Sequence, residues 1–148
     1  MRFIKYLLLL SIVLGSRNTY SQQKNNTMTN QEIVKKILNG FNDPAQIQES
    51  LDLLADDYKF QNPLVKLNSK SEFIALAQSI GEVLTGIEIV RLVEADEWVA
   101  AFYIFKSSIP GVESNTATEW FRLKNEIIQE SILIYDASEW RKVYEQME

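Results

Sequence analysis

Two carboxylates near the end of the chain, Glu119 and Asp136, are the first candidates for acid–base chemistry. Both lie in a stretch, residues 115–136, whose alternating apolar and polar side chains predict two strands joined by a tight turn. Glu119 falls on the apolar side of the first strand. A carboxyl group on that side either lies at the mouth of a pocket or shows that the strand has a different register from the predicted one. Asp136 shares a side of the second strand with Ile132 and Ile134, so we expect a second acid at the same cavity.

Each acid also has a structural explanation. Glu119 could pair with Arg91 or a lysine, or it could face solvent at a bulge in the strand. Asp136 stands before a short stretch of helical character, residues 138–144, and aspartate is a common N-cap. Arg91 shares its predicted strand side with Ile89. It could neutralise a pocket acid, or lie at the sheet edge with its aliphatic stem buried.

The chain contains no histidine and no cysteine. This composition excludes Ser–His and Cys–His nucleophiles, histidine metal ligands and the usual general base at neutral pH. Any catalysis would therefore depend on Asp, Glu, Tyr or Lys. Zinc and iron sites built from carboxylates alone are uncommon, so we expect no metal and no cofactor.

Aromatic side chains and a small number of polar groups typically hold a flat apolar ligand. Aromatic residues occur on several predicted strands, and the amide of Asn62, directly before Pro63, could orient a ligand carbonyl. The alternatives are core or interface residues for the aromatics and a turn residue for Asn62. Trp120 falls on the strand side opposite Glu119, so we expect it on the sheet exterior or in an interface. The candidate ligand contacts are Tyr58, Asn62, Arg91, Tyr103, Phe105, Phe121 and Tyr135.

Helices are predicted to precede most of the strands. Thr29 and Glu32 form a capping-box pattern before the first helix, and Asp43-Pro44 begins a second helix that the apolar spacing extends to Leu54. Ser69 or Ser71 caps a third helix. The predicted strands cover residues 58–63, 87–93, 98–107, 115–124 and 127–136, with a short helix after the last.

This order of elements predicts an α+β domain, in which a long curved sheet with helices on one face encloses a conical cavity. The strand at residues 98–107 is apolar on both sides, with Val99 and Tyr103 on one side and Phe102 and Ile104 on the other. A strand that is apolar on both faces is covered on both faces. We therefore expect a homodimer that forms through the sheet.

The first residues predict a secretory leader rather than a part of the fold, and the alternative is a single membrane anchor with the domain outside. Arg2 and Lys5 precede a short apolar run, and small residues precede a cleavage point after Ser21. We expect a signal peptide at residues 1–21, a flexible linker at 22–28, one domain at 29–148, and a periplasmic or secreted protein without a membrane anchor after cleavage.

Cleavage after Ser21 would leave 12 basic residues against 20 acidic ones, because three of the 15 basic residues of the chain lie in the leader and none of the acidic residues does. The resulting net charge of −8 disfavours partners with a phosphate backbone. No run of basic residues with interleaved aromatics occurs in the sequence. We therefore expect no nucleic-acid partner.

Four segments of the chain resemble segments of the nuclear transport factor 2-like superfamily, and within it of the SnoaL-like proteins. They are residues 53–63 (Leu-Leu-Ala-Asp-Asp-Tyr-Lys-Phe-Gln-Asn-Pro), the helical stretch 70–80, residues 119–123 (Glu-Trp-Phe-Arg-Leu) and residues 134–136 (Ile-Tyr-Asp). The resemblance spans about residues 29–148. It implies a cone-shaped, curved antiparallel or mixed sheet packed against about three N-terminal helices, a cystatin-like roll.

The resemblance also implies roles for single residues. Asn62 occupies the position of the aspartate base in ketosteroid isomerase-like members, and an amide cannot accept a proton at neutral pH, which argues against isomerase activity. Glu119 matches an acid that an apolar site keeps protonated in those members. Asp136 is a candidate for the cavity aspartate of SnoaL-like cyclases, and Arg91 for the arginine between two aspartates in epoxide-hydrolase-like members.

Three functions remain open, because proteins with this fold include enzymes and non-catalytic domains. The first is an exported SnoaL-like domain that binds a small, largely apolar molecule without turning it over. The second is an enzyme of the lyase, isomerase or hydrolase type that uses Glu119 and Asp136 with a tyrosine. The third is a non-catalytic dimeric interaction module. A cavity lined by Glu119 would favour the first two, and a filled core would favour the third.

Overall fold

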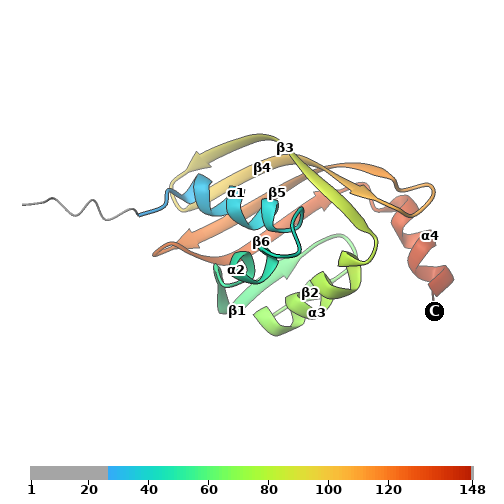
Figure 1. The fold of residues 1–148 in the computed structure, drawn as a ribbon, viewed down its shortest axis with the longest axis horizontal. Coiled ribbons are helices and arrows are strands. Elements are labelled where there is room, and N and C mark those ends of the chain that lie inside the picture. The colour runs from blue at the N-terminus through green and yellow to red at the C-terminus, as the bar shows by residue number, and fades with distance from the viewer. Residues whose placement is uncertain (1–26, 148) are drawn as a thin grey trace, which may run out of the picture.

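The computed structural model describes residues 27–147 as an α+β domain in which helices cover one face of a curved sheet (Figure 1). The predicted signal peptide and most of the predicted linker lie outside the described residues. Within residues 27–147, every helix is too short or too polar to cross a membrane. The elements are α1 (Asn30–Gly40), α2 (Ile47–Leu51), β1 (Leu54–Gln61), β2 (Lys66–Leu67), α3 (Lys70–Gly81), β3 (Leu84–Ala95), β4 (Trp98–Ser107), β5 (Ser114–Lys124), β6 (Ile127–Tyr135) and α4 (Ser138–Met147).

The six strands form one mixed sheet in the order β2-β1-β6-β5-β4-β3. Strands β3 to β6 are successive antiparallel neighbours, as the sequence predicts, while β1 joins β6 in parallel and β2 pairs antiparallel with β1. The β5–β6 turn places Asn125 and Glu126 at φ 52° and 63°, which is typical of the turns that match the twist of a hairpin. The predicted fold class is therefore confirmed.

Two helices supply most of the cover on the inner face of the sheet. The capping box of Thr29 and Glu32 begins α1, as predicted, and α1 packs against β3 and β4 with a stripe that includes Val34 and Leu38. Ser69 caps α3, which buries Phe73 toward β1. These helices and the curved sheet form the walls of the interior.

The second helix is shorter than its apolar spacing predicts. It spans Ile47–Leu51, and the segment from Leu54 onward belongs to β1, where Leu54 pairs with Ile128. The backbone hydrogen bonds between β1 and β6 stabilise the extended conformation of this segment more than its apolar spacing favours a helix. The chain turns tightly here and brings Gly40 close to Ser50. A Cβ on Gly40 would lie only 2.2 Å from the Ser50 hydroxyl oxygen, so this position requires glycine.

Two of the bulges in the sheet change which of the predicted site residues face the interior. On β6 the pairing shifts at Gln129, and on β3 it shifts at Val90. Each bulge adds one residue to its strand, which reverses the inward and outward alternation beyond it and bends the sheet. The residues beyond the bulges therefore lie on the opposite face from the one that strict alternation predicts.

Candidate functional site

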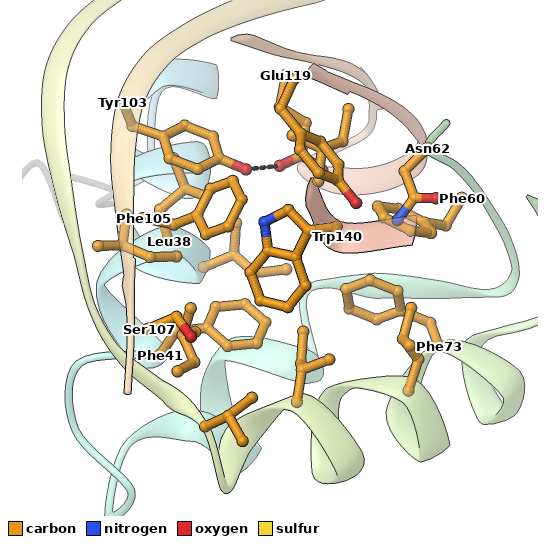
Figure 2. Close-up of a pocket in the computed structure, with 18 of the residues that line it drawn as sticks. Leu38, Phe41, Phe60, Asn62, Phe73, Tyr103, Phe105, Ser107, Glu119 and Trp140 are labelled. Atoms are coloured by element: carbon orange, nitrogen blue, oxygen red, sulfur yellow. Dashed lines mark hydrogen bonds between the residues drawn. The ribbon is translucent and has the colours of Figure 1, made fainter. Parts of the chain in front are cut away.

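A partly enclosed cavity lies between the inner face of the sheet and the helices (Figure 2). The cavity volume is about 110 Å³, which is room for several waters or a small organic molecule. Most of the lining is aliphatic and aromatic. The residues on β1, β4, β5 and β6 that line it are Tyr58, Phe60, Tyr103, Phe105, Ser107, Glu119, Phe121, Leu133 and Tyr135.

Glu119 is the acid of this cavity. Its side chain projects from the inner face of β5 with only 5% of its surface exposed. The Tyr103 hydroxyl donates to Oε2 at 2.7 Å, and the Ser131 hydroxyl donates to Oε1 at 2.6 Å. The predicted position of Glu119, on the apolar face and beside a pocket, is the position observed.

A third hydroxyl extends this network. The Tyr58 and Ser131 hydroxyl oxygens lie 2.6 Å apart. A hydroxyl group has one proton, and because that of Ser131 is donated to Glu119, Tyr58 must donate to Ser131. All three hydroxyl groups therefore donate in the direction of the Glu119 carboxyl group. This arrangement favours the ionised carboxylate, because a carboxylate only accepts hydrogen bonds.

Burial and hydrogen bonding act on Glu119 in opposite directions. Burial raises the pKa of the Glu119 carboxyl above its usual value of 4.5, while the hydrogen bonds from Ser131 and Tyr103 lower it, and burial is the larger effect. Burial and the neighbouring Glu119 charge raise the pKa of both Tyr58 and Tyr103 well above 10.0. The tyrosines therefore remain neutral donors at physiological pH, and Glu119 can exchange a proton at a higher pH than an ordinary glutamate.

Asn62 lies at the rim of the cavity directly after β1. Its Oδ1 accepts hydrogen bonds from the backbone N–H groups of Leu64 and Val65, both at 2.8 Å. These bonds fix the turn before β2 and hold the amide with its nitrogen toward the cavity (Figure 2). The turn role and the pocket position, which the sequence leaves as alternatives, occur together.

The other predicted aromatic contacts also face the cavity. Phe105, Phe121 and Tyr135 line it, and Phe105 packs against Tyr135 with ring centroids 5.4 Å apart. Trp120 lies on the outer face with 45% of its surface exposed, as predicted. The structure therefore brings six of the sequence-predicted residues, Tyr58, Asn62, Tyr103, Phe105, Phe121 and Tyr135, to the wall that contains Glu119.

Two predicted site residues lie elsewhere. Asp136 is exposed and caps α4 by accepting hydrogen bonds from the backbone N–H and hydroxyl of Ser138, which lower the pKa of its carboxyl. Arg91 is exposed and pairs with Phe102 on the outer face of the sheet. The expectation of a second cavity acid and a cavity arginine is wrong, because the bulges at Gln129 and Val90 reverse the alternation on which it depends.

Sequence reasoning misses several residues of the site, and two of them have side-chain hydrogen bonds there. Trp140 lies in the first turn of α4, lines the cavity and donates from Nε1 to Asn115 Oδ1 at 2.9 Å (Figure 2). Ser131 is buried beside Glu119 only because the bulge turns it inward. The helical spacing of Trp140 and Tyr144 on one side of α4 is a signal for the first residue, whereas the sequence contains no comparable signal for the second.

Comparison with family models finds none that matches this chain, and comparison with curated proteins finds no match. Solved structures do match. A nuclear transport factor 2-like protein of unknown function from Cytophaga hutchinsonii has a TM-score of 0.66 at 12% identity, over 81% of this chain and 98% of that one. A candidate polyketide cyclase from Xanthomonas campestris has a TM-score of 0.61 at 17% identity, over 74% and 92%.

A third similar structure is that of a hypothetical protein with a ketosteroid isomerase-like fold from Catenulispora acidiphila, solved in complex with trimethylamine. Its TM-score is 0.63 at 15% identity, over 74% of this chain and 89% of that one. These similarities show that the chain has the nuclear transport factor 2-like fold, of the kind that SnoaL-like proteins share. The resemblance found in the sequence is thus confirmed for the fold.

Proposed function

We propose that this protein is an exported SnoaL-like domain that binds a small, largely apolar molecule in its cavity without turning it over. The observation that carries the proposal is Glu119, a hydrogen-bonded acid in the wall of an apolar hollow that side chains leave open. A pocket with a mostly apolar lining and a few placed polar groups is the usual form of a small-molecule site. The similar protein from Catenulispora acidiphila holds a small molecule, trimethylamine, which supports ligand binding by a domain of this fold.

Native mass spectrometry of the protein purified from its own host tests this proposal. We expect a mass above that of the bare chain, and release of a small molecule on denaturation. The Leu76→Trp variant, which places a bulky ring in the cavity lining, should lack the extra mass. A bare mass for freshly isolated protein, with no binding of any apolar probe, would contradict the proposal.

Export is part of the proposal and rests on the sequence of residues 1–21. N-terminal sequencing of the protein from its host should give Gln22 as the first residue, in the periplasm or the medium. A chain that retains Arg2 and Lys5 inside the cell would contradict export. The binding proposal does not depend on that result.

A second candidate function, acid–base catalysis, is favoured by the raised pKa of Glu119. A carboxyl group with a raised pKa can donate and accept protons nearer to neutral pH, and Tyr103 could share its proton. Asn62 stands where isomerase-like proteins have their base, and Asp136 is outside the cavity, so Glu119 would act alone among the carboxylates of the lining. Turnover of a released ligand by the wild type, but not by Glu119→Gln, would favour catalysis over binding.

We also propose that two copies of the chain associate through the outer face of the sheet. Val93, Ala100, Trp120 and Ile132 lie in register across four strands, and Phe102 and Ile134 lie in the next row. Several of these side chains are unusually exposed for their size, among them Trp120 and Ile134 at 45% and 52%. A contiguous exposed apolar surface marks an interaction site, and a two-fold dimer buries the same surface from both partners.

A further inference from the structure

Among residues 27–147, the cavity lining contains an acid but no basic residue. The titratable residues that line it are Glu119 and four tyrosines, Tyr58, Tyr103, Tyr135 and Tyr144, and its lining includes no lysine and no arginine. None of the six ion pairs found in residues 27–147 involves Glu119. A buried carboxylate is ordinarily paired with an opposite charge, which the described residues do not supply here.

The hydroxyl network favours the ionised form of Glu119, which can bind a cation. Tyr103 and Ser131 both donate to it, and Tyr58 donates to Ser131, so every proton of the network points toward the carboxyl group. These bonds use one position on each carboxylate oxygen, and an oxygen of this type has further acceptor positions. A cation that enters the cavity would meet an acceptor whose negative charge is held in place.

Aromatic rings surround the rest of the site. Phe105 lies at the centre of a group with ring centroids 6.5 Å from Tyr103, 5.4 Å from Tyr135 and 6.0 Å from Trp140. All four line the cavity, and Figure 2 shows the Trp140 indole below the Tyr103–Glu119 pair. The faces of aromatic rings attract organic cations, most strongly for Trp and Tyr.

We propose that the cavity selects a small apolar organic cation, an amine or quaternary ammonium. Its charged nitrogen lies beside Glu119, and its alkyl groups contact Phe105, Tyr135 and Trp140. A metal ion or a strongly hydrated cation does not fit, because the lining offers one carboxylate and few other oxygen ligands. This inference rests on the proposed binding function and specifies the ligand class of the same site.

The experiment compares two probes of the same shape, choline and 3,3-dimethylbutan-1-ol, in which carbon replaces the ammonium nitrogen. Isothermal titration of the purified protein at neutral pH should show choline binding at least about tenfold more tightly than the alcohol. Glu119→Gln should remove most of this preference. Glu130→Gln, which alters an acid paired with Arg122 outside the cavity, is the matched control and should keep it.

A second variant keeps Glu119 intact. Trp140→Leu should weaken choline binding more than alcohol binding, because it removes an aromatic face and retains an apolar side chain. Equal or tighter binding of the neutral alcohol by the wild type would overturn the cation inference and leave small-molecule binding standing. Failure of both probes at millimolar concentration would also overturn it, whereas the proposed function is judged separately by native mass spectrometry, which does not depend on ligand charge.

Discussion

Tyr103 and Glu119 are diagonal neighbours on the inner face of the sheet, where Glu119 pairs directly with Ala101 and the Tyr103 hydroxyl reaches Glu119 Oε2 at 2.7 Å. Side chains that are diagonal across two strands lie within reach of one another when one of them is long. The small side chain of Ala101 leaves room for this contact. The site therefore depends on the β4–β5 register.

The first prediction concerns the pH dependence of stability. Because the folded-state pKa of Glu119 is raised above 4.5, the folded protein binds a proton more tightly than the unfolded chain does. This contribution to the free energy of unfolding is fully present below pH 4.5 and is lost as pH rises through the folded-state pKa. The chain has no histidine, so few other side chains titrate just below neutral pH.

Chemical denaturation of the wild type and Glu119→Gln across this pH range measures the effect. The difference in unfolding free energy between the two proteins should change in favour of the glutamine variant as pH rises above 4.5, and then level off. Acids such as Asp136, whose pKa is lowered, give the opposite slope, but they are common to both proteins and cancel. A difference that is independent of pH would contradict the burial of an ionisable Glu119.

The second prediction concerns Tyr103→Phe. This substitution removes one of the two hydroxyl donors to Glu119 and should raise the carboxyl pKa further, because that hydrogen bond favours the ionised form. We expect a loss of about 1–3 kcal/mol in unfolding free energy at neutral pH, the usual range for a hydrogen bond to a charged group.

Tyr135→Phe is its matched control. Tyr135 lines the same cavity, and its hydroxyl has no hydrogen-bond partner in the side-chain network of residues 27–147. The control should change stability by less than about 0.5 kcal/mol and leave the titration of Glu119 nearly unchanged. Equal effects of the two substitutions would show that the Tyr103–Glu119 contact has no special energetic role.

The third prediction concerns the space in the cavity. Leu76→Trp adds a ring to the wall formed by α3, whereas Gln78→Trp adds the same ring to the exposed side of that helix. We expect the first variant to lose ligand binding at least about tenfold, at a cost of about 1–3 kcal/mol in stability, and the second to bind normally. Binding that persists in a folded Leu76→Trp protein would place the ligand outside this cavity.

The two acids that the sequence proposes for the site, Glu119 and Asp136, show how far the site is predictable. The sequence predicts the position of Glu119 correctly because β5 alternates without interruption from Asn115 to Arg122, and its partner strand β4 does the same. It predicts the position of Asp136 wrongly because the bulge at Gln129 intervenes. A bulge depends on how two strands and their turn fit together. The spacing of side chains along one strand therefore does not predict it.

The fold as a whole is more predictable than the details of the site. The α1 and α3 caps and the β3–β6 meander have local signals in residue type and spacing. The parallel pairing of β1 with β6 has none, because it joins segments that are far apart in the chain. The same holds for the position of Trp140 in the cavity, because the other lining residues come from distant parts of the chain.

The fourth prediction concerns the outer face. Light scattering at micromolar concentration should give a dimer for the wild type and a monomer for Trp120→Glu, because a charge in the centre of an apolar interface remains unpaired. Gln78→Glu, on a helix on the other side of the sheet, is the control and should stay dimeric. A monomeric wild type would refute the dimer without affecting the cavity.

The fifth prediction links ligand affinity to pH. If an organic cation binds the ionised form of Glu119, choline affinity should rise as pH increases through the carboxyl pKa and reach a plateau above it. Burial raises the pKa of Tyr58, Tyr103 and Tyr135, which face the same cavity, so these tyrosines stay neutral in this range and add no charge. Affinity that is constant, or that falls with rising pH, would contradict an ion pair with Glu119.

The most direct test of this account is the titration of the Glu119 side chain itself, followed by the ¹³C chemical shift of its carboxyl carbon. The Glu119→Gln variant assigns the signal by its absence. We predict a midpoint clearly above 4.5, and a shift of that midpoint to lower pH when choline is added. A midpoint at or below 4.5 in the free protein would contradict a carboxyl group buried in the wall of an apolar cavity, and with it the proposed site.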